Sequence, residues 1–92
     1  MDVQHQQNSR GGIFLVVEDG ETVGEMTYGL REGVMAIDHT WVSPARRGGG
    51  LARALVDAGV AFARAEGLTV LPLCSYVVKV FHEEPSLAVG AR

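Results

Sequence analysis

The stretch RRGGGLA, residues 46–52, places three consecutive glycines between two arginines and a strongly helical pattern. Glycine weakens a helix, so a glycine run at a helix start needs a reason in the backbone or in a ligand. The first N–H groups of a helix lack internal partners, and the helix dipole gives this end partial positive charge. A phosphate could therefore lie directly on amides without Cβ atoms, with Arg46 and Arg47 adding charge-assisted contacts. The residues indicate a phosphate site; the alternative is a flexible turn with two solvated arginines.

Two common nucleotide-binding motifs do not describe this loop well. A Walker loop ends in Gly-Lys-Ser/Thr, whereas the chain continues as Gly50-Leu51-Ala52. The dinucleotide fingerprint Gly-x-Gly-x-x-Gly has its third glycine three residues after the second. The segment GGGLARA lacks this third glycine.

The glycine loop follows a predicted antiparallel meander. β-Branched and aromatic residues with short turns between them predict three strands, at residues 13–19, 22–30 and 34–42. Residues 1–11 are polar and rich in Gln, without periodicity, and predict a disordered tail. Residues 12–92 are then expected to form a single domain.

A helix over about residues 49–66 is expected after Pro44, which ends the third strand. The apolar residues on one face of this helix predict its core contact: Leu51, Leu55, Ala58, Phe62 and Ala65. Residues 68–73 predict a fourth, buried strand that a βαβ crossover places parallel to the third. Residues 77–84 predict a second, short helix. The fold class is α+β (mixed α/β), compact, with two helices.

Composition limits the function classes. The chain has 92 residues and a net charge of −3, which argues against a general nucleic-acid binder. No apolar run reaches the roughly 18–20 residues of a membrane span, and a secretory signal pattern is missing, so a cytoplasmic protein is expected. A single cysteine forms no internal disulfide, and no metal site is expected.

At the glycine loop the chain resembles the GNAT superfamily of acyl-CoA-dependent N-acyltransferases. RRGGGLA matches the family signature Arg/Gln-x-x-Gly-x-Gly/Ala as Arg47-x-x-Gly50-x-Ala52. The resemblance is strongest to small stand-alone GNAT-like proteins, sometimes called YjdJ-type. It rests on three elements in order, HTWV (39–42), RRGGGLARALV (46–56) and VLPLCSYV (70–77), and covers roughly residues 13–85.

The resemblance implies a compact, truncated GNAT-like fold that binds acetyl-CoA or coenzyme A. The pyrophosphate would rest on the loop amides, and the pantetheine arm would lie where the third and fourth strands splay apart. The implied cofactor-binding residues are Trp41, Val42, Arg46, Arg47, Gly48, Gly49, Gly50, Leu51 and Ala52.

Three residues are candidates for the chemistry of acyl transfer. Cys74 follows the fourth strand and would serve as nucleophile or in proton transfer, unless it is a small buried hydrophobe. His39 has the titration range of a general base, but we expect it to share a strand face with Ile37 and Trp41, where a packed histidine is the alternative. Tyr76 would be the acid for the thiolate, as the resemblance suggests, or would only pack. Trp41 departs from the family, which usually has an acidic residue there.

These observations predict an acetyl-CoA-dependent N-acetyltransferase whose acceptor is an unidentified amine, on a small molecule or a protein. The alternatives are a CoA-binding or acyl-CoA-binding module with little catalytic activity, and an interaction domain with exposed apolar residues. No nucleic-acid or membrane partner is expected, and the chain is expected to be a monomer or weak homodimer.

Overall fold

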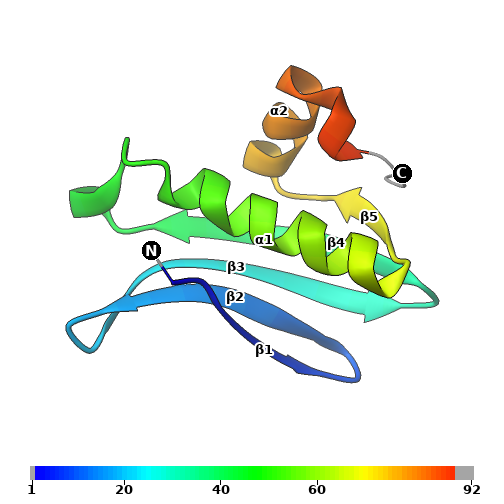
Figure 1. The fold of residues 1–92 in the computed structure, drawn as a ribbon, viewed down its shortest axis with the longest axis horizontal. Coiled ribbons are helices and arrows are strands. Elements are labelled where there is room, and N and C mark those ends of the chain that lie inside the picture. Colours follow the sequence, from blue (N-terminus) through cyan, green and yellow to red (C-terminus); the bar gives the residue numbers. More distant parts are fainter. Residues whose placement is uncertain (1, 89–92) are drawn as a thin grey trace.

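The computed structural model of the chain describes residues 2–88 as a single sheet with two helices packed on it (Figure 1). The strands lie side by side in chain order, β1 to β5. Pairing is antiparallel from β1 to β4, and β5 runs parallel to β4. The strands are β1 (Gln4–Asn8), β2 (Gly11–Glu18), β3 (Glu21–Arg31), β4 (Val34–Val42) and β5 (Thr69–Pro72). The predicted meander, crossover and α+β class are confirmed.

The prediction of a disordered tail over residues 1–11 is wrong for most of that segment. Gln4–Asn8 form β1, which pairs with β2, and Gly11 is already the first residue of β2. The imidazole of His5 stacks on Phe14 with ring centroids 4.0 Å apart, and it also contacts Tyr28 and Phe62. Strand pairing and the contacts of His5 with three aromatic rings therefore order a segment whose polar composition gave no signal. At the other end, residues 89–92 of the predicted domain lie outside the described residues.

A β-bulge changes the direction of the side chains in β4. Tyr28 pairs with Ile37 while the preceding Thr27 pairs with His39, so Asp38 is an extra residue in β4. Because side chains alternate along a strand, the extra residue reverses the two faces beyond it. Ile37 points into the core, whereas His39 and Trp41 are exposed. The expectation that His39 shares a face with Ile37 is therefore wrong.

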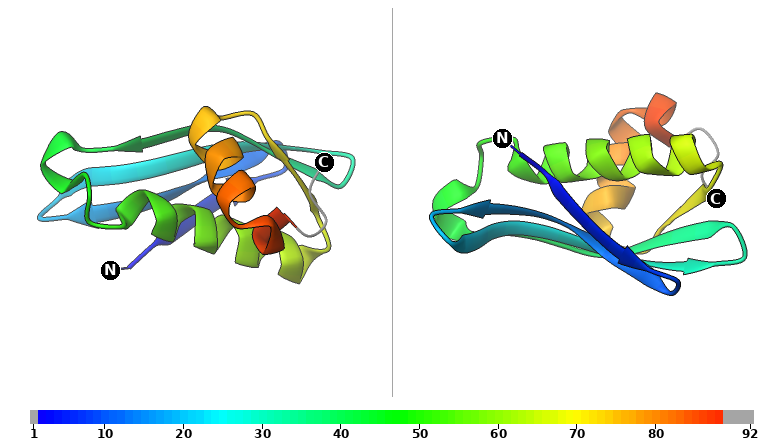
Figure 2. Two further views of the ribbon diagram at one scale, coloured as in Figure 1. Left: turned by 90° about the horizontal axis from the view of Figure 1, so that it is seen from above. Right: turned by 60° about the horizontal axis from the view of Figure 1, so that its bottom comes forward.

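Both helices lie on the same side of the sheet (Figure 2). They are α1 (Leu51–Glu66) and α2 (Ser75–Glu83), with two short 3-10 helices, η1 (Pro44–Arg46) and η2 (Pro85–Ala88). We call the opposite side of the sheet the open face. Core residues on β2, β3 and β4 meet both helices in one cluster, which includes Phe14, Met26, Met35, Ile37, Leu55, Val60, Val77 and Phe81.

The buried side of α1 is rotated from the predicted one. Leu51 and Leu55 are buried as expected, but Phe62 is only half-buried and Ala65 is exposed. The helix instead buries Val56, Gly59, Val60 and Ala63. Gly59 lies directly over the sheet, since a Cβ there would be 2.6 Å from the methyl group of Met26. The close approach of backbone to sheet, which a helical wheel does not show, decides the rotation.

Replacement of the two large side chains tests this packing. Leu55 is fully buried, so Leu55→Ala should cost about 2–5 kcal/mol of unfolding free energy. Phe62→Ala should cost less than the ~3–5 kcal/mol of a fully buried phenylalanine, because the side chain is only partly buried. Ala65→Ser serves as the exposed control and should cost only about 0.5 kcal/mol, the difference in helix propensity. Urea denaturation measures all three, and a larger loss for Phe62→Ala than for Leu55→Ala would contradict the observed rotation.

Candidate active site

The glycine loop ends at an uncapped helix start. Gly48 and Gly50 have φ angles of 83° and 81°, in the left-handed region that glycine adopts without strain. Gly50 is the N-cap of α1; its cap carries no side-chain hydrogen bond, and the first turn has no acidic residue. The first amides of the helix therefore have no side-chain partner. A Cβ at Gly48 or Gly50 would meet nothing within 4 Å, so the loop faces open space.

The loop is held by the first side chain of α1. Leu51 is 1% exposed and packs over Gly24 of β3, where a Cβ would overlap the leucine side chain. Glycine at position 24 thus lets the helix start lie against the sheet. On the other side, Ser43 N donates to Val23 O over 2.8 Å and fixes the end of β4.

A cavity of about 300 Å³ lies against this loop. It extends from the end of β4, past the loop and the first turn of α1, to the start of α2. Its lining residues are Val42, Arg46, Arg47, Gly48, Gly50, Leu51, Ala52, Arg53 and Tyr76. Seven of the nine residues predicted for cofactor binding are in this lining, together with Tyr76. Trp41 and Gly49 are the predicted residues outside it, and Arg53 is a lining residue that the sequence reasoning missed.

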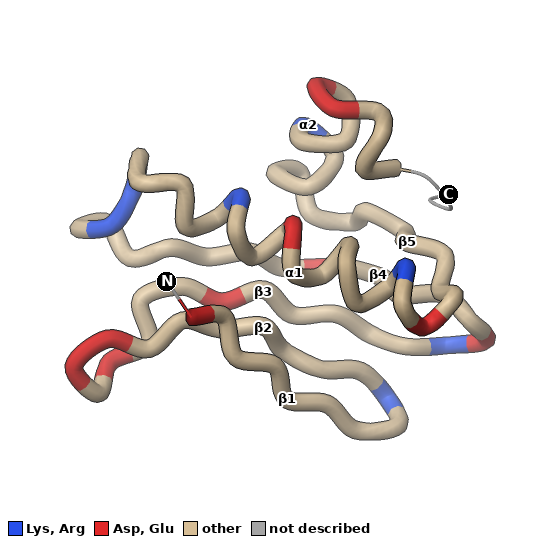
Figure 3. Tube along the Cα trace, viewed as in Figure 1, with Lys and Arg blue, Asp and Glu red and all other residues tan. Residues whose placement is uncertain are grey.

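The three arginines of the cavity differ in their partners. Arg46 forms an ion pair with Glu18, where β2 ends. Figure 3 shows acidic positions of the β2–β3 turn and basic positions of the loop before α1 at the same end of the molecule. Nε of Arg47 donates to the neutral carbonyl of Val42 over 3.3 Å.

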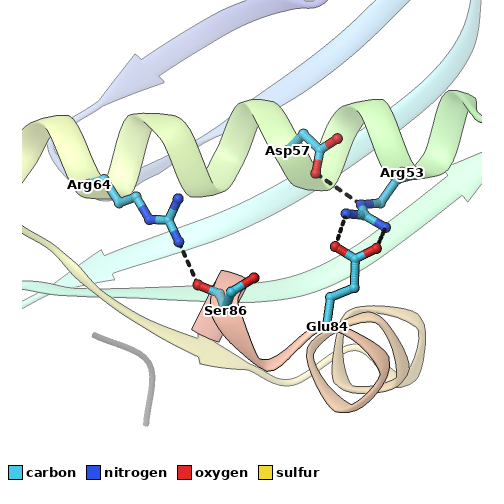
Figure 4. A network of polar contacts seen from close by, with 5 residues as sticks. All are labelled: Arg53, Asp57, Arg64, Glu84 and Ser86. Atoms are coloured by element: carbon cyan, nitrogen blue, oxygen red, sulfur yellow. Dashed lines mark hydrogen bonds and ion pairs between the residues drawn. The ribbon is translucent and has the colours of Figure 1, made fainter. Parts of the chain in front are cut away.

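Arg53 connects the two helices. Its guanidinium donates to both carboxylate oxygens of Glu84, over 2.9 and 2.6 Å, and to Asp57 over 2.9 Å (Figure 4). The hydrogen bonds from Arg53 lower the pKa of the Glu84 carboxyl. Farther along α1, Arg64 donates to the carbonyl of Ser86 over 2.6 Å. The end of α2 and the start of η2 are thus tied to α1.

The pairing between β4 and β5 ends early. β5 pairs with Val34–Ile37 only, and Leu73 N and Cys74 N both donate to Ile37 O, over 2.9 and 3.1 Å. Beyond this carbonyl, β5 leaves the edge of β4 and the chain enters α2. Cys74, the N-cap of α2, therefore lies where the two strands separate.

The environment of Cys74 favours its thiolate. Burial alone would raise the pKa of the thiol, but the nearby Thr40 hydroxyl and the N–H groups of Val77, Tyr76 and Thr40 favour the thiolate, outweigh burial and lower the pKa. Among the described residues the buried Thr40 hydroxyl has no hydrogen bond of ordinary geometry, so an ionised Cys74 would be its partner. The sequence reasoning missed Thr40, because the bulge at Asp38 decides that Thr40 points inward.

The other two catalytic candidates are separated by the sheet. Tyr76 lines the cavity, and burial raises the pKa of its phenol, so it stays protonated at neutral pH. His39 is on the open face, with Nε2 at 3.6 Å from Glu25 and half of its side chain exposed. The structure brings Cys74 and Tyr76 together at the start of α2 and does not bring His39 to them.

Comparison with known proteins defines the class of this fold and site. A family model described as GCN5-related N-acetyl-transferase matches residues 13–89. The chain belongs to this family of N-acetyltransferases. No curated protein is similar enough to count as a match.

Solved structures support the same assignment. A GCN5-like protein from Staphylococcus aureus aligns with a TM-score of 0.73 and 25% identity, over 97% of this chain and 87% of that one. A GNAT-family protein from Desulfovibrio desulfuricans has 30% identity and a TM-score of 0.58, over 63% of this chain; the match covers 39% of that longer chain. An aminoglycoside N-acetyltransferase in complex with CoA aligns over 83% of this chain and 67% of that one, with a TM-score of 0.67 and 18% identity, and shows the fold alone.

Within residues 2–88, none of the helices is long and apolar enough to cross a membrane. In the same residues, no group of three or more His, Cys, Asp or Glu side chains is placed to hold a metal ion.

Titration of the thiol tests the environment of Cys74. The pKa should lie below that of an unperturbed cysteine, about 8.5, because the Thr40 hydroxyl and nearby N–H groups favour the thiolate. The pH dependence of alkylation by iodoacetamide, read by mass spectrometry, gives the value. Thr40→Val keeps the shape and removes the hydroxyl, so it should raise the pKa. A wild-type pKa above ~8.5, or no change in Thr40→Val, would contradict the assigned role of the hydroxyl.

Proposed function

We propose that the protein is an acetyl-CoA-dependent N-acetyltransferase that transfers an acetyl group to an amine. The observation that carries this proposal is the cavity that joins the uncapped start of α1 to the start of α2. One end offers free amides and arginines to phosphates, and the other carries groups that can exchange protons. Membership of the GCN5-related family supports the same activity.

The phosphate end fits the pyrophosphate of coenzyme A. Amides of the first turn of α1 have no side-chain partner, and the left-handed glycines leave the approach open. Arg47 is the lining arginine whose described hydrogen bond goes to a neutral carbonyl, so its charge is free to act on a phosphate. We expect Gly48, Gly50, Leu51 and Ala52 to hold the pyrophosphate through the backbone. A structural neighbour that was solved with CoA supports this choice of ligand.

The separation of β4 and β5 suits the pantetheine arm. Beyond Ile37 no described strand covers this edge of β4, and Val42 lines the cavity. Main-chain groups near Val42 would then pair with the amides of the arm, while Trp41 contributes its backbone, since its side chain is directed to the open face. The thioester end would approach Cys74.

The chemistry needs an activated carbonyl, a neutral amine and a proton for the leaving thiolate. Acetyl-CoA supplies the activated acyl group when bound. The protonated phenol of Tyr76 is suited to donate a proton at its oxygen. The thiol of Cys74, with its lowered pKa, can act as a nucleophile or move a proton. His39 could accept a proton only from an amine that approaches across the open face.

A second candidate function is a CoA-binding module with little catalytic activity. It is favoured by the separation of His39 from Cys74 and Tyr76, because the histidine that could accept a proton from the amine lies on the open face beside Glu25. Binding alone does not distinguish the two functions, whereas turnover with acetyl-CoA does.

Substitution of Gly49 tests the phosphate site. Gly49 lacks the left-handed φ of its neighbours, and a Cβ there would be at ordinary distance, 3.5 Å, from Arg46 O, so a side chain can be added without strain. Gly49→Asp puts a carboxylate beside the phosphates and should weaken CoA binding at least about tenfold, or ~1.4 kcal/mol. Gly49→Asn has the same shape without the charge and should weaken binding less. Calorimetry measures both, and equal affinities of wild type and a folded Gly49→Asp protein would exclude this site.

Turnover separates the roles of Cys74. Incubation with acetyl-CoA and a panel of amines should yield acetylated amine and free CoA. If Cys74 takes the acetyl group, intact-mass spectrometry should show an acetyl increment that hydroxylamine removes. Cys74→Ser should then lose the increment and most turnover while keeping CoA affinity. Full turnover in Cys74→Ala would assign the residue to packing, and absence of turnover in wild type with intact CoA binding would favour the binding module.

A further inference from the structure

The arginine nearest the β2–β3 turn has its charge compensated inside the protein. Arg46 lines the cavity and forms an ion pair with Glu18, the last residue of β2. The two residues are 28 positions apart in the chain, so the pair connects the edge of the meander to the loop region. It leaves the rim of the cavity with a carboxylate beside the place where we expect phosphates.

We propose that Glu18 sets the affinity for CoA by acting as an internal competitor for Arg46. The proposal rests on the proposed CoA site. In the free protein, the Glu18 carboxylate binds the Arg46 guanidinium, which would otherwise be available to a phosphate. A bound phosphate then has to share Arg46 with Glu18 or displace it, and Glu18 itself repels the ligand.

The exposure of the pair makes this exchange easy. The side chains of Arg46 and Glu18 are 38% and 37% exposed, and the contact is a single one, through one nitrogen and one oxygen. Ion pairs of this exposure contribute little net stability, because water solvates both charges when they separate. A phosphate with two or more charged oxygens is a stronger partner for a guanidinium than one carboxylate contact.

Arg53 shows the contrasting case in the same cavity. Both carboxylate oxygens of Glu84 bind its guanidinium and Asp57 binds a third donor, so three contacts tie it between α1 and α2. Release of Arg53 would also remove this polar connection between the two helices. Arg53 therefore has a structural role, whereas the Glu18–Arg46 pair can open without moving an element of the core.

Removal of the Glu18 carboxylate should strengthen CoA binding. Damage to the fold would weaken binding instead, so the two effects differ in direction. Glu18→Gln keeps the size of the side chain and frees Arg46, so CoA should bind about three- to tenfold tighter at low salt, as expected for one partly exposed charge. The gain should shrink at high salt, where the Debye length falls to about 3 Å at 1 M.

The matched control is Glu32→Gln. Glu32 is exposed in the β3–β4 turn, at the opposite end of the sheet, and its replacement changes the net charge by the same amount. CoA affinity should stay at the wild-type value. Arg46→Met completes a double-mutant cycle, in which Glu18→Gln should give much less gain once Arg46 is absent.

Isothermal calorimetry with CoA, at about 20 mM and 1 M salt, decides the proposal. Tighter binding by Glu18→Gln that depends on Arg46 and fades with salt supports it. Unchanged or weaker binding by Glu18→Gln, or an equal gain in the Arg46→Met background or in Glu32→Gln, overturns it while the CoA site itself stands. Failure of the wild-type protein to bind CoA would instead overturn the proposed function, and this inference with it.

Discussion

The carbonyl of Ile37 is the point on which the arrangement of the site depends. It accepts hydrogen bonds from both Leu73 and Cys74, and no further pairing between β4 and β5 follows it. A parallel pair normally continues with evenly spaced bonds. Here two donors share one acceptor, so the chain turns away from the sheet and starts α2. The site exists because the sheet opens at this residue.

The bulge at Asp38 follows immediately and determines which side chains point to the helical side of the sheet and which to the open face. Thr40 is turned toward Cys74, and His39 and Trp41 are turned to the open face. The helical side thus holds the thiol, the phenol of Tyr76 and the phosphate loop. The open face offers an exposed histidine, a carboxylate and an indole. One inserted residue therefore divides the candidate chemistry between two sides of one strand.

The sequence predicted the elements well and their orientation less well. The glycine loop, the helix after it and the parallel crossover follow from local chemistry, since glycine, proline and apolar periodicity act over a few residues. The order of Gln4–Asn8 comes from partners in β2 and α1 that are distant in the chain. The rotation of α1 depends on Gly59 resting on Met26. The face of the sheet on which His39 lies depends on a bulge that neither residue type nor spacing indicates. The missed residues Thr40, Arg53 and Glu18 all gain their place from such distant contacts.

The contact between Leu51 and Gly24 has a further consequence for the loop. Ordering a loop of three glycines costs much conformational entropy, so the loop needs a contact that holds it in place. Here the anchor is an apolar side chain set into the space of a missing Cβ on β3. Anchoring and ligand binding thus use different atoms. Van der Waals contact of the Leu51 side chain fixes the position of the loop, and the loop amides remain available to a ligand. A substitution on β3, remote in sequence from the loop, would therefore displace every amide of the helix start together.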